Sequence, residues 1–249
     1  MITAQQVKFI KSLQNKKFRH ENGLFVAEGE KLVYDLLDGS LCFRNVYHTS
    51  EWEIPTRARN RNYQQVSPKE MERISGLVNP STVLAVIEYP NYEVKHSELL
   101  ESLTLVLDDI QDPGNLGTII RLADWFGIDN IVCSLGSADA FSPKVVQASM
   151  GAISRVKVAY CNIPDFLREI KGAMPVYGTF MDGSDIYTTS LKPKGLIVMG
   201  NEGSGISREV ELFITSKLRI PNFAKNRESV ESLNVAMATA IICSEFRRR

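Results

Sequence analysis

From residue 103 onward, short apolar runs alternate with longer segments whose apolar residues recur at helical spacing. The apolar runs are short and rich in Val, Ile and Leu, as buried strands are, and they cover 103–107, 130–134, 176–180, 196–199 and 218–221. Helices are expected between and after them, at 115–126, 142–150, 164–170 and 235–246. This alternation predicts an α/β fold with a parallel sheet that helices cover on both faces.

The first ninety residues have a less regular pattern. It predicts helices at 5–17, at 28–37 and from Ser67-Pro68 to about residue 75, with strands at 24–27, 45–47 and 82–87. These elements form a small α/β/α unit. Because the stretch that follows is polar and mixed in charge, we expect domain 1–90, a linker at 91–102 and a second domain at 103–249.

Composition indicates a globular protein. Hydrophobic residues make up 44% of the 249 residues, which is enough to bury a core. There is no run of 18 apolar residues and no signal-peptide core near the start, so we expect a cytoplasmic protein with no membrane partner. The net charge is zero, but positive residues cluster at 8–19, 57–61 and 247–249. These clusters indicate either a basic face for nucleic acid or ordinary solvated charge.

The cysteines and histidines exclude several kinds of chemistry. The four cysteines are widely spaced, form no C-x-x-C pair and mostly lie in apolar surroundings, as expected for buried thiols. The three histidines all precede residue 97, and none has a partner at metal-ligand spacing. We therefore expect no metal site and no histidine general base from the C-terminal half.

A glycine-rich loop, Gly200-Asn201-Glu202-Gly203-Ser204-Gly205, follows the strand expected at 196–199. Parallel sheets place ligand crevices at such strand ends, so this loop is a candidate binding site. It is not a nucleotide triphosphate loop, because Ile206 occupies the lysine position. A dinucleotide fingerprint also fails, since Arg208 stands where a third small residue belongs.

Two further stretches carry polar residues at element ends. Residues 107–121 contain a strand end, a Pro113-Gly114 turn, Asn115 at the expected N-cap and Arg121 within the helix. Arg121 is either an interface arginine or a phosphate ligand, because its planar fork suits phosphate. Ser232 and Asn234 either cap the last helix or belong to the same site.

Three stretches taken together carry a family resemblance. DPGNLGTIIRLADWFGID, LIVMGNEGSGIS, and RIP followed by SLNVAMATAI resemble, in this order, motifs one, two and three of the SpoU (TrmH-like) branch of the SPOUT RNA methyltransferases. The resemblance covers about residues 103–249. The stretch GLFVAEGEKLVYDLL is similar to the ribosomal-protein-like substrate-binding domain of many members. Together they imply an S-adenosylmethionine-dependent enzyme that methylates a ribose 2'-hydroxyl of RNA, with ribosomal RNA favoured over transfer RNA.

The resemblance also implies a deep C-terminal trefoil knot, a homodimer and a set of site residues. The positions that match cofactor contacts are Gly200, Asn201, Ile220 and Leu233. The positions that match catalytic residues are Arg121, Asn115, Glu202, Ser232 and Asn234. Arg121 would engage the target phosphate and help to activate the hydroxyl.

One segment departs from the family pattern. Residues 222–231 are longer than the usual link between motif halves, and Ala224 stands where a glycine is expected. This insertion could reshape the rim of the cofactor pocket. The alternative function is a noncatalytic RNA-binding or ribosome-assembly protein that keeps the fold. The sequence does not encode which nucleotide is modified.

Overall fold

The chain of the computed structural model forms two compact units, and the structure describes residues 1–92, 96–224 and 232–248. The first unit contains Met1–Asn91 together with Asp139–Arg155, and the second contains Tyr92–Ala138 together with Val156–Arg249. The return of segment 139–155 to the first unit was not foreseen from the sequence pattern, and the domain bounds given above stay a prediction. No helix among the described residues is long and apolar enough to cross a membrane.

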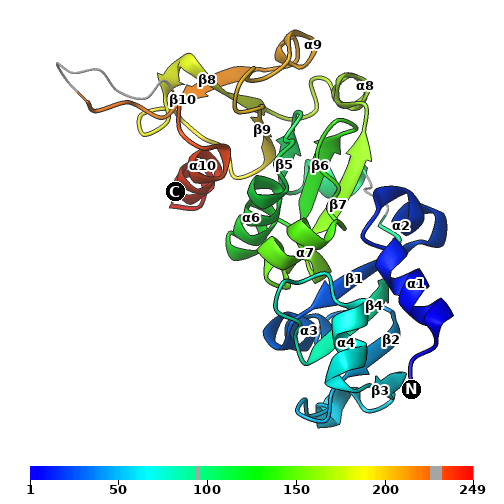
Figure 1. The fold of residues 1–249 in the computed structure, drawn as a ribbon. Helices are drawn as coiled ribbons and strands as arrows, with labels where there is room; N and C mark the ends of the chain where they lie inside the picture. The colour runs from blue at the N-terminus through cyan, green and yellow to red at the C-terminus, as the bar shows by residue number, and fades with distance from the viewer. Residues whose placement is uncertain (93–95, 225–231, 249) are drawn as a thin grey trace. The chain divides into compact units, whose positions relative to one another are not determined.

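The first unit is built on a four-stranded sheet with the order β1-β4-β2-β3 (Figure 1). Its strands are β1 (Leu24–Glu28), β2 (Phe43–His48), β3 (Tyr63–Gln65) and β4 (Val83–Glu88), and β4 runs antiparallel to both neighbours. Its helices are α1 (Ala4–Ser12), α2 (Lys16–Asn22), α3 (Glu30–Leu37), the 3-10 turn η1 (Thr56–Ala58) and α4 (Pro68–Ile74).

One local prediction for this unit was wrong, and one strand was missed. The single helix expected at 5–17 is two helices, because the Asn15 side chain accepts a hydrogen bond from the Lys17 amide and starts α2 anew. Strand β3 was missed because its three residues are too few and too polar to show alternation. The Ser67-Pro68 helix start is confirmed, with Ser67 and Glu70 forming a reciprocal cap.

Segment 139–155 is held to the first unit by a buried ion pair and by aromatic packing. Asp139 accepts two hydrogen bonds from the Arg19 guanidinium, at 3.2 and 2.6 Å, and both side chains are almost fully buried. The Phe141 ring lies 5.1 Å from that of Phe25 and 4.5 Å from that of Tyr89. The segment carries α7 (Pro143–Ser149), which contacts β1, and η2 (Ala152–Ser154).

The second unit contains a six-stranded sheet with the order β10-β8-β9-β5-β6-β7, and every pair in it is parallel, as predicted (Figure 1). The strands are β5 (Leu103–Leu107), β6 (Asn130–Ser134), β7 (Lys157–Cys161), β8 (Val176–Asp185), β9 (Gly195–Met199) and β10 (Ser216–Arg219). The helices are α5 (His96–Leu100), α6 (Pro113–Trp125), α8 (Ile163–Glu169), α9 (Arg208–Glu211) and α10 (Val235–Arg248). Strand β7 was missed because it lies at the sheet edge and is only partly buried.

Helices cover both faces of this sheet, which confirms the prediction. On one face, Val106, Val132 and Val198 pack with Phe166 of α8 and Val210 of α9. Residues alternate between faces along a strand, so the neighbours of these valines point to the other side. There the ring of Tyr177 contacts that of Phe246 in α10, and α10 packs on α6.

The strand order brings two polar loops side by side. Strand β9 pairs with β5 so that Met199 lies opposite Leu107 at the carboxyl ends of both strands. The ladder continues one step further, since the Asp108 amide donates to the Met199 carbonyl at 2.9 Å. The loop that begins at Asp108 and the loop that begins at Gly200 therefore leave the same edge of the sheet.

Candidate functional site

The glycine loop after β9 is a closed backbone turn. The amide of Asn201 donates to the carbonyl of Gly205 at 3.0 Å, and the Gly205 amide donates back at 2.9 Å. A Cβ on Gly200 would lie 2.3 Å from the backbone of Gly205 and Ile206, so only glycine fits at the strand end. This packing explains the glycine that the sequence places there.

Asn201 fixes the turn rather than projecting into solvent. Its Oδ1 accepts from the amides of Gly203 at 2.9 Å and Ser204 at 3.1 Å, and its Nδ2 donates to the carbonyl of Asp109 at 2.8 Å. The loops after β5 and β9 are thus joined through one amide side chain. Asn201 therefore shapes the candidate site through the backbone of both loops.

The loop after β5 contains two aspartates with structural roles that the sequence reasoning missed. Asp108 is 7% exposed and accepts from the Ser207 amide at 2.8 Å. Asp112, and not Asn115, is the N-cap of α6, since its carboxylate accepts from the Asn115 amide at 2.8 Å. The earlier N-cap places Pro113 at the first helical position, which suits its missing N–H. The side chain of Asn115 is therefore not used for capping.

Asn115 joins all three sequence motifs in one hydrogen-bonded chain. Its Nδ2 donates to Glu202 Oε1 of the glycine loop, and its Oδ1 accepts from Nδ2 of Asn234 at 3.0 Å. The three residues are separated by 87 and 119 positions in the sequence, so only the fold brings them together. A carboxylate and two amides in a fixed order form a preorganised polar surface, as reactions with developing charge require.

Asn234 has two roles at once. Its Oδ1 accepts from the amides of Ala236 at 3.0 Å and Met237 at 3.3 Å, so it caps α10. Its Nδ2 is the group that donates to Asn115. The interpretation of Ser232 as the N-cap was wrong, because Asn234 fills that position. Ser232 is exposed and lies on the wall of the cavity described next.

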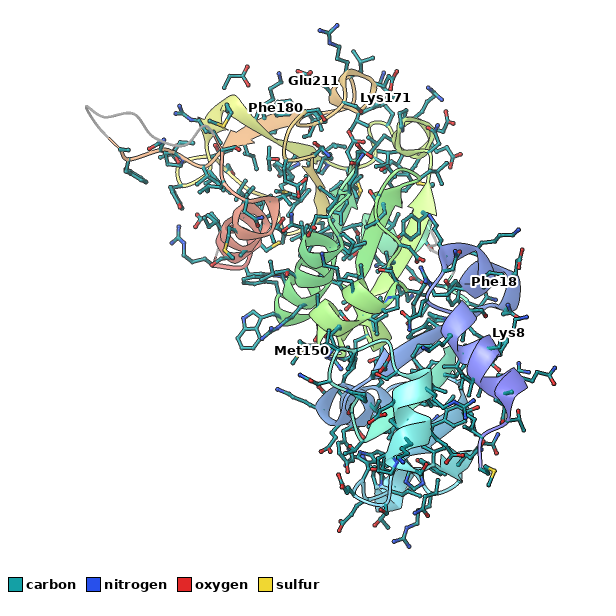
Figure 2. The ribbon with its side chains drawn as sticks, in the orientation of Figure 1. Lys8, Phe18, Met150, Lys171, Phe180 and Glu211 are labelled. Atoms are coloured by element: carbon teal, nitrogen blue, oxygen red, sulfur yellow. The ribbon has the colours of Figure 1, made fainter. Side chains whose placement is uncertain are left out.

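A cavity of about 890 Å³ lies beside the glycine loop, within the size range of small-molecule sites. Six of the residues predicted from motifs two and three line it: Gly200, Asn201, Glu202, Ile220, Ser232 and Leu233. Thr179, Phe180 (Figure 2) and Arg219 also line it and were not predicted as site residues, although all three lie within predicted strands. Loop glycines and apolar side chains such as Phe180, Ile220 and Leu233 both line this cavity, which suits a ligand with a flat ring and polar edges.

Arg121 lies outside both this hydrogen-bonded chain and the cavity wall. It is exposed on α6, directly after Ile119 and Ile120, which are fully buried. Among the described residues it forms no ion pair or hydrogen bond. An arginine whose five donors have no acceptor among the described residues is suited to a ligand with several acceptor oxygens.

Arginines of the basic clusters mostly have structural partners. Arg57 pairs with Asp38, and Arg61 lies 4.4 Å above the Phe43 ring. Arg247 donates to the carbonyls of Phe126 at 2.7 Å and Gly127 at 2.6 Å, which closes the C-terminal end of α6. Structural contacts therefore account for these three arginines without a role in binding nucleic acid.

The cysteines take no part in the candidate site. Burial raises the pKa of the Cys243 thiol to about 12, and burial also raises the pKa of Cys133 and Cys161. Cys42 is exposed, contrary to the general expectation of buried thiols.

No group of three or more His, Cys, Asp or Glu residues in the described part of the chain is placed to hold a metal ion. Residues 225–231, most of the predicted insertion at the pocket rim, lie outside the described residues.

Two family models match separate parts of the chain. The model of the SpoU rRNA Methylase family matches residues 102–244, and that of the MRM3-like substrate binding domain matches residues 4–85. The 23S rRNA (guanosine(2553)-2'-O)-methyltransferase of Bacillus subtilis (strain 168) is 30% identical over 246 residues, which cover 98% of this chain and 96% of that protein.

Two solved structures align over the whole chain. A structure from Porphyromonas gingivalis, assigned to the TrmH family of RNA methyltransferases, has a TM-score of 0.87 and 42% identity and covers 100% of this chain and 99% of its own. The AdoMet-bound rRNA methyltransferase of Sinorhizobium meliloti has a TM-score of 0.84 and 32% identity and covers 100% and 96%. The family match spans more than half of the chain and includes the cavity, the glycine loop and the Asn115 contacts, so this chain belongs to the SpoU rRNA methylase family.

Proposed function

We propose that this protein transfers a methyl group from S-adenosylmethionine to a ribose 2'-hydroxyl of RNA, with ribosomal RNA as the substrate class. The observation that carries the proposal is the chain of contacts from Asn234 through Asn115 to Glu202 at the edge of the 890 Å³ cavity. Such a chain links residues from three separate motifs, and a purely structural domain has no need of it. The relatives named as rRNA methyltransferases support the substrate class.

The cavity residues fit the proposed cofactor. Gly200, Ile220 and Leu233 would hold the adenosine part, with backbone groups reading its polar edges and the two apolar side chains covering its ring. Asn201 would keep the glycine loop in the shape that this contact needs. S-adenosylmethionine, when bound, supplies an electrophilic methyl group on its sulfonium.

The protein's part in the reaction is alignment and charge stabilisation. A ribose hydroxyl is a weak nucleophile, so the site must hold it in line with the methyl group and accommodate the charge that develops. We assign Arg121 to the phosphate of the target nucleotide, since its guanidinium has no partner within the described chain. Asn115, Glu202, Ser232 and Asn234 would orient the reacting groups, and the bound phosphate is one candidate acceptor for the hydroxyl proton.

The wider properties of the family belong to the same proposal. We propose a deep trefoil knot at the C-terminal end, a homodimer, a cytoplasmic location and no membrane partner. The homodimer is supported by apolar side chains that α6 and α10 leave exposed, since Trp125 is 82% and Met237 is 59% exposed. The noncatalytic alternative predicts no use for the Asn115 contacts and is the weaker explanation of them.

The test is methyl transfer from labelled S-adenosylmethionine to ribosomal RNA from cells that lack this protein, followed by nucleoside analysis. A 2'-O-methylnucleoside at one position is the expected product. Arg121→Ala is expected to lower the transfer rate at least a hundredfold while leaving cofactor affinity unchanged. Arg168→Ala is the matched control, because Arg168 is an exposed helical arginine of the same unit that pairs with Asp165. Normal transfer by Arg121→Ala would refute the role assigned to Arg121. If the unsubstituted protein neither transfers a methyl group nor binds the cofactor, the noncatalytic alternative is favoured.

A further inference from the structure

Phe180 is a half-buried ring in the wall of the 890 Å³ cavity, and none of the three motifs includes it. It lies in β8, where it also packs against the core that contains Val198 of β9 and Val210 of α9. The ring therefore belongs both to the core and to the cavity wall. The contacts that hold the ring in place also determine the shape of this wall.

The strand beneath the ring leaves room for it. Gly178 lies two residues before Phe180 and on the same face of β8. A Cβ on Gly178 would lie 2.7 Å from Cε2 of Phe180 and 2.9 Å from Cδ1 of Ile214. A larger residue would displace the ring or Ile214, so glycine at this position allows the ring to lie over the strand.

A cation covers the ring from the neighbouring strand. Lys217 of β10 lies opposite Gly178 in the parallel ladder, and its Nζ lies 4.4 Å from the centroid of the Phe180 ring. An ammonium group at this distance is attracted by the π-electrons of the ring. Lys217 does not itself line the cavity, so its contact with the cavity wall runs through the ring.

Glu211 of α9 holds the ammonium group in turn. Its Oε1 accepts from Lys217 Nζ at 2.5 Å, and this hydrogen bond raises the pKa of Lys217, so the lysine is charged at neutral pH. The side chains of Lys217 and Glu211 are 40% and 38% exposed, and an ion pair this exposed contributes little to stability. Contacts from α9, β10 and β8 thus converge on one ring of the cavity wall, and Figure 2 labels Glu211 and Phe180.

We propose that Lys217 and Glu211 are positioning residues for the cofactor: they hold the Phe180 ring as the wall against which the adenosine part of S-adenosylmethionine packs. A wall whose side chain is already fixed strengthens binding, because less side-chain freedom is lost when the ligand enters. Lys217 and Glu211 act through the ring and do not contact the cofactor. The inference rests on the proposed function and adds to it two residues outside the cavity that set its affinity for the cofactor.

The experiment measures the affinity of the full-length protein for S-adenosylhomocysteine and for 5'-methylthioadenosine by calorimetry. Both ligands contain the adenosine part, and only the first has the amino-acid part. Lys217→Met keeps a side chain of similar length and removes the ammonium group. It should weaken the binding of both ligands about fivefold, the order expected for one cation–π contact. Lys217→Arg can still cover the ring and pair with Glu211, so it should bind both within about twofold of the unsubstituted protein.

Lys157→Met is the matched control. Lys157 pairs with Glu98 at 2.8 Å in the same unit, the two side chains are 35% and 39% exposed, and Lys157 does not line the cavity. Lys157→Met and Lys217→Met should have similar Tm values, because each removes one exposed ion pair. Only Lys217→Met should lose affinity, which separates the positioning of the ring from a general effect on stability.

Phe180→Leu tests whether Lys217 acts through the ring. In this background Lys217→Met should cause no further loss of affinity, because residues in contact have non-additive effects. The same loss with and without the Phe180 ring would overturn the inference, and so would unchanged affinity in Lys217→Met. A loss for S-adenosylhomocysteine alone would contradict packing of the ring against the adenosine part.

The same titrations distinguish this inference from the proposed function. If the unsubstituted protein binds neither ligand, both fail. If it binds them and Lys217→Met binds them equally well, the proposed function stands and the inference alone fails. If the affinities change as expected but ribosomal RNA receives no methyl group, the reaction assignment fails and the positioning role stands.

Discussion

Asn234 allows the structural and the catalytic use of one side chain to be separated. Its Oδ1 caps α10 through two backbone amides, and its Nδ2 contacts Asn115 at 3.0 Å. Asn234→Ala removes both uses. Asn234→Ser keeps a capping oxygen but has no N–H group that could donate to Asn115.

The two substitutions should therefore differ in stability and agree in activity. Loss of an N-cap costs about 1 kcal/mol, which in a chain of this length lowers Tm by roughly 2–4 °C, so this is the expectation for Asn234→Ala. Serine is as good a cap as asparagine, so Asn234→Ser should melt within about 1 °C of the unsubstituted protein. Both variants should transfer methyl groups ten- to a hundredfold more slowly, on the order of the loss caused by small misplacement of reacting groups.

A cap elsewhere in the same unit provides the control. Asn162 caps α8 by accepting from the Asp165 amide at 3.1 Å and lies at no part of the cavity wall. Asn162→Ala should lose about the same 1 kcal/mol as Asn234→Ala and keep full activity. Thermal melts and single-turnover methyl transfer on the four proteins measure both quantities. Full activity in Asn234→Ser would show that the contact with Asn115 is not needed for the reaction, and the reasoning would be wrong.

Three further predictions concern the glycine loop, the thiols and the N-terminal cap. Gly200→Ala should abolish cofactor binding in calorimetry, because its Cβ would overlap the backbone of Gly205 at 2.3 Å; retained affinity would contradict the packing. At pH 8, iodoacetamide should label Cys42 alone in the folded protein and all four cysteines in denaturant. The reason is that the thiolate is the reactive form and burial raises the pKa of Cys243 to about 12. Mass spectrometry of the labelled native sample decides this. Backbone hydrogen bonds lower the pKa of Glu70 to about 2. The stabilisation of the fold by its carboxylate should therefore be present above about pH 4.5 and be lost as pH falls through 2. An unchanging difference in Tm between Glu70→Gln and the unsubstituted protein over this range would exclude this contribution.

The parallel sheet and the position of the glycine loop could be predicted from the sequence because both depend on local patterns. An apolar run followed by Gly200 and Asn201 specifies a buried strand and a polar loop without reference to the rest of the chain. The N-cap of α6 was misplaced by three residues because Asp112 and Asn115 are both good capping residues, and the pattern does not choose between them. The structure decides for Asp112, whose carboxylate accepts from the amide of Asn115.

Local sequence patterns could not predict contacts between distant segments. The return of segment 139–155 to the first unit depends on the pairing of Asp139 with Arg19, 120 positions away. The dual role of Asn234 depends on where α6 lies relative to α10, which no spacing rule reports. The resemblance to a family assigned these residues to one site, but only the fold gives the order in which they contact one another.

Helix α6 explains how Arg121 can be well placed while having no partner among the described residues. Asp112 caps the first turn of this helix, Arg247 satisfies the carbonyls at its end, and Ile119 and Ile120 are fully buried beneath it. The backbone that carries Arg121 is therefore fixed on both sides, while the guanidinium itself is exposed and has no partner in the described chain. A side chain on a rigid element loses only its own rotamer freedom when it binds, so a phosphate contact needs no rearrangement of the site. Arg247, the first residue of the basic cluster at 247–249, thus contributes to the proposed reaction through the position of α6.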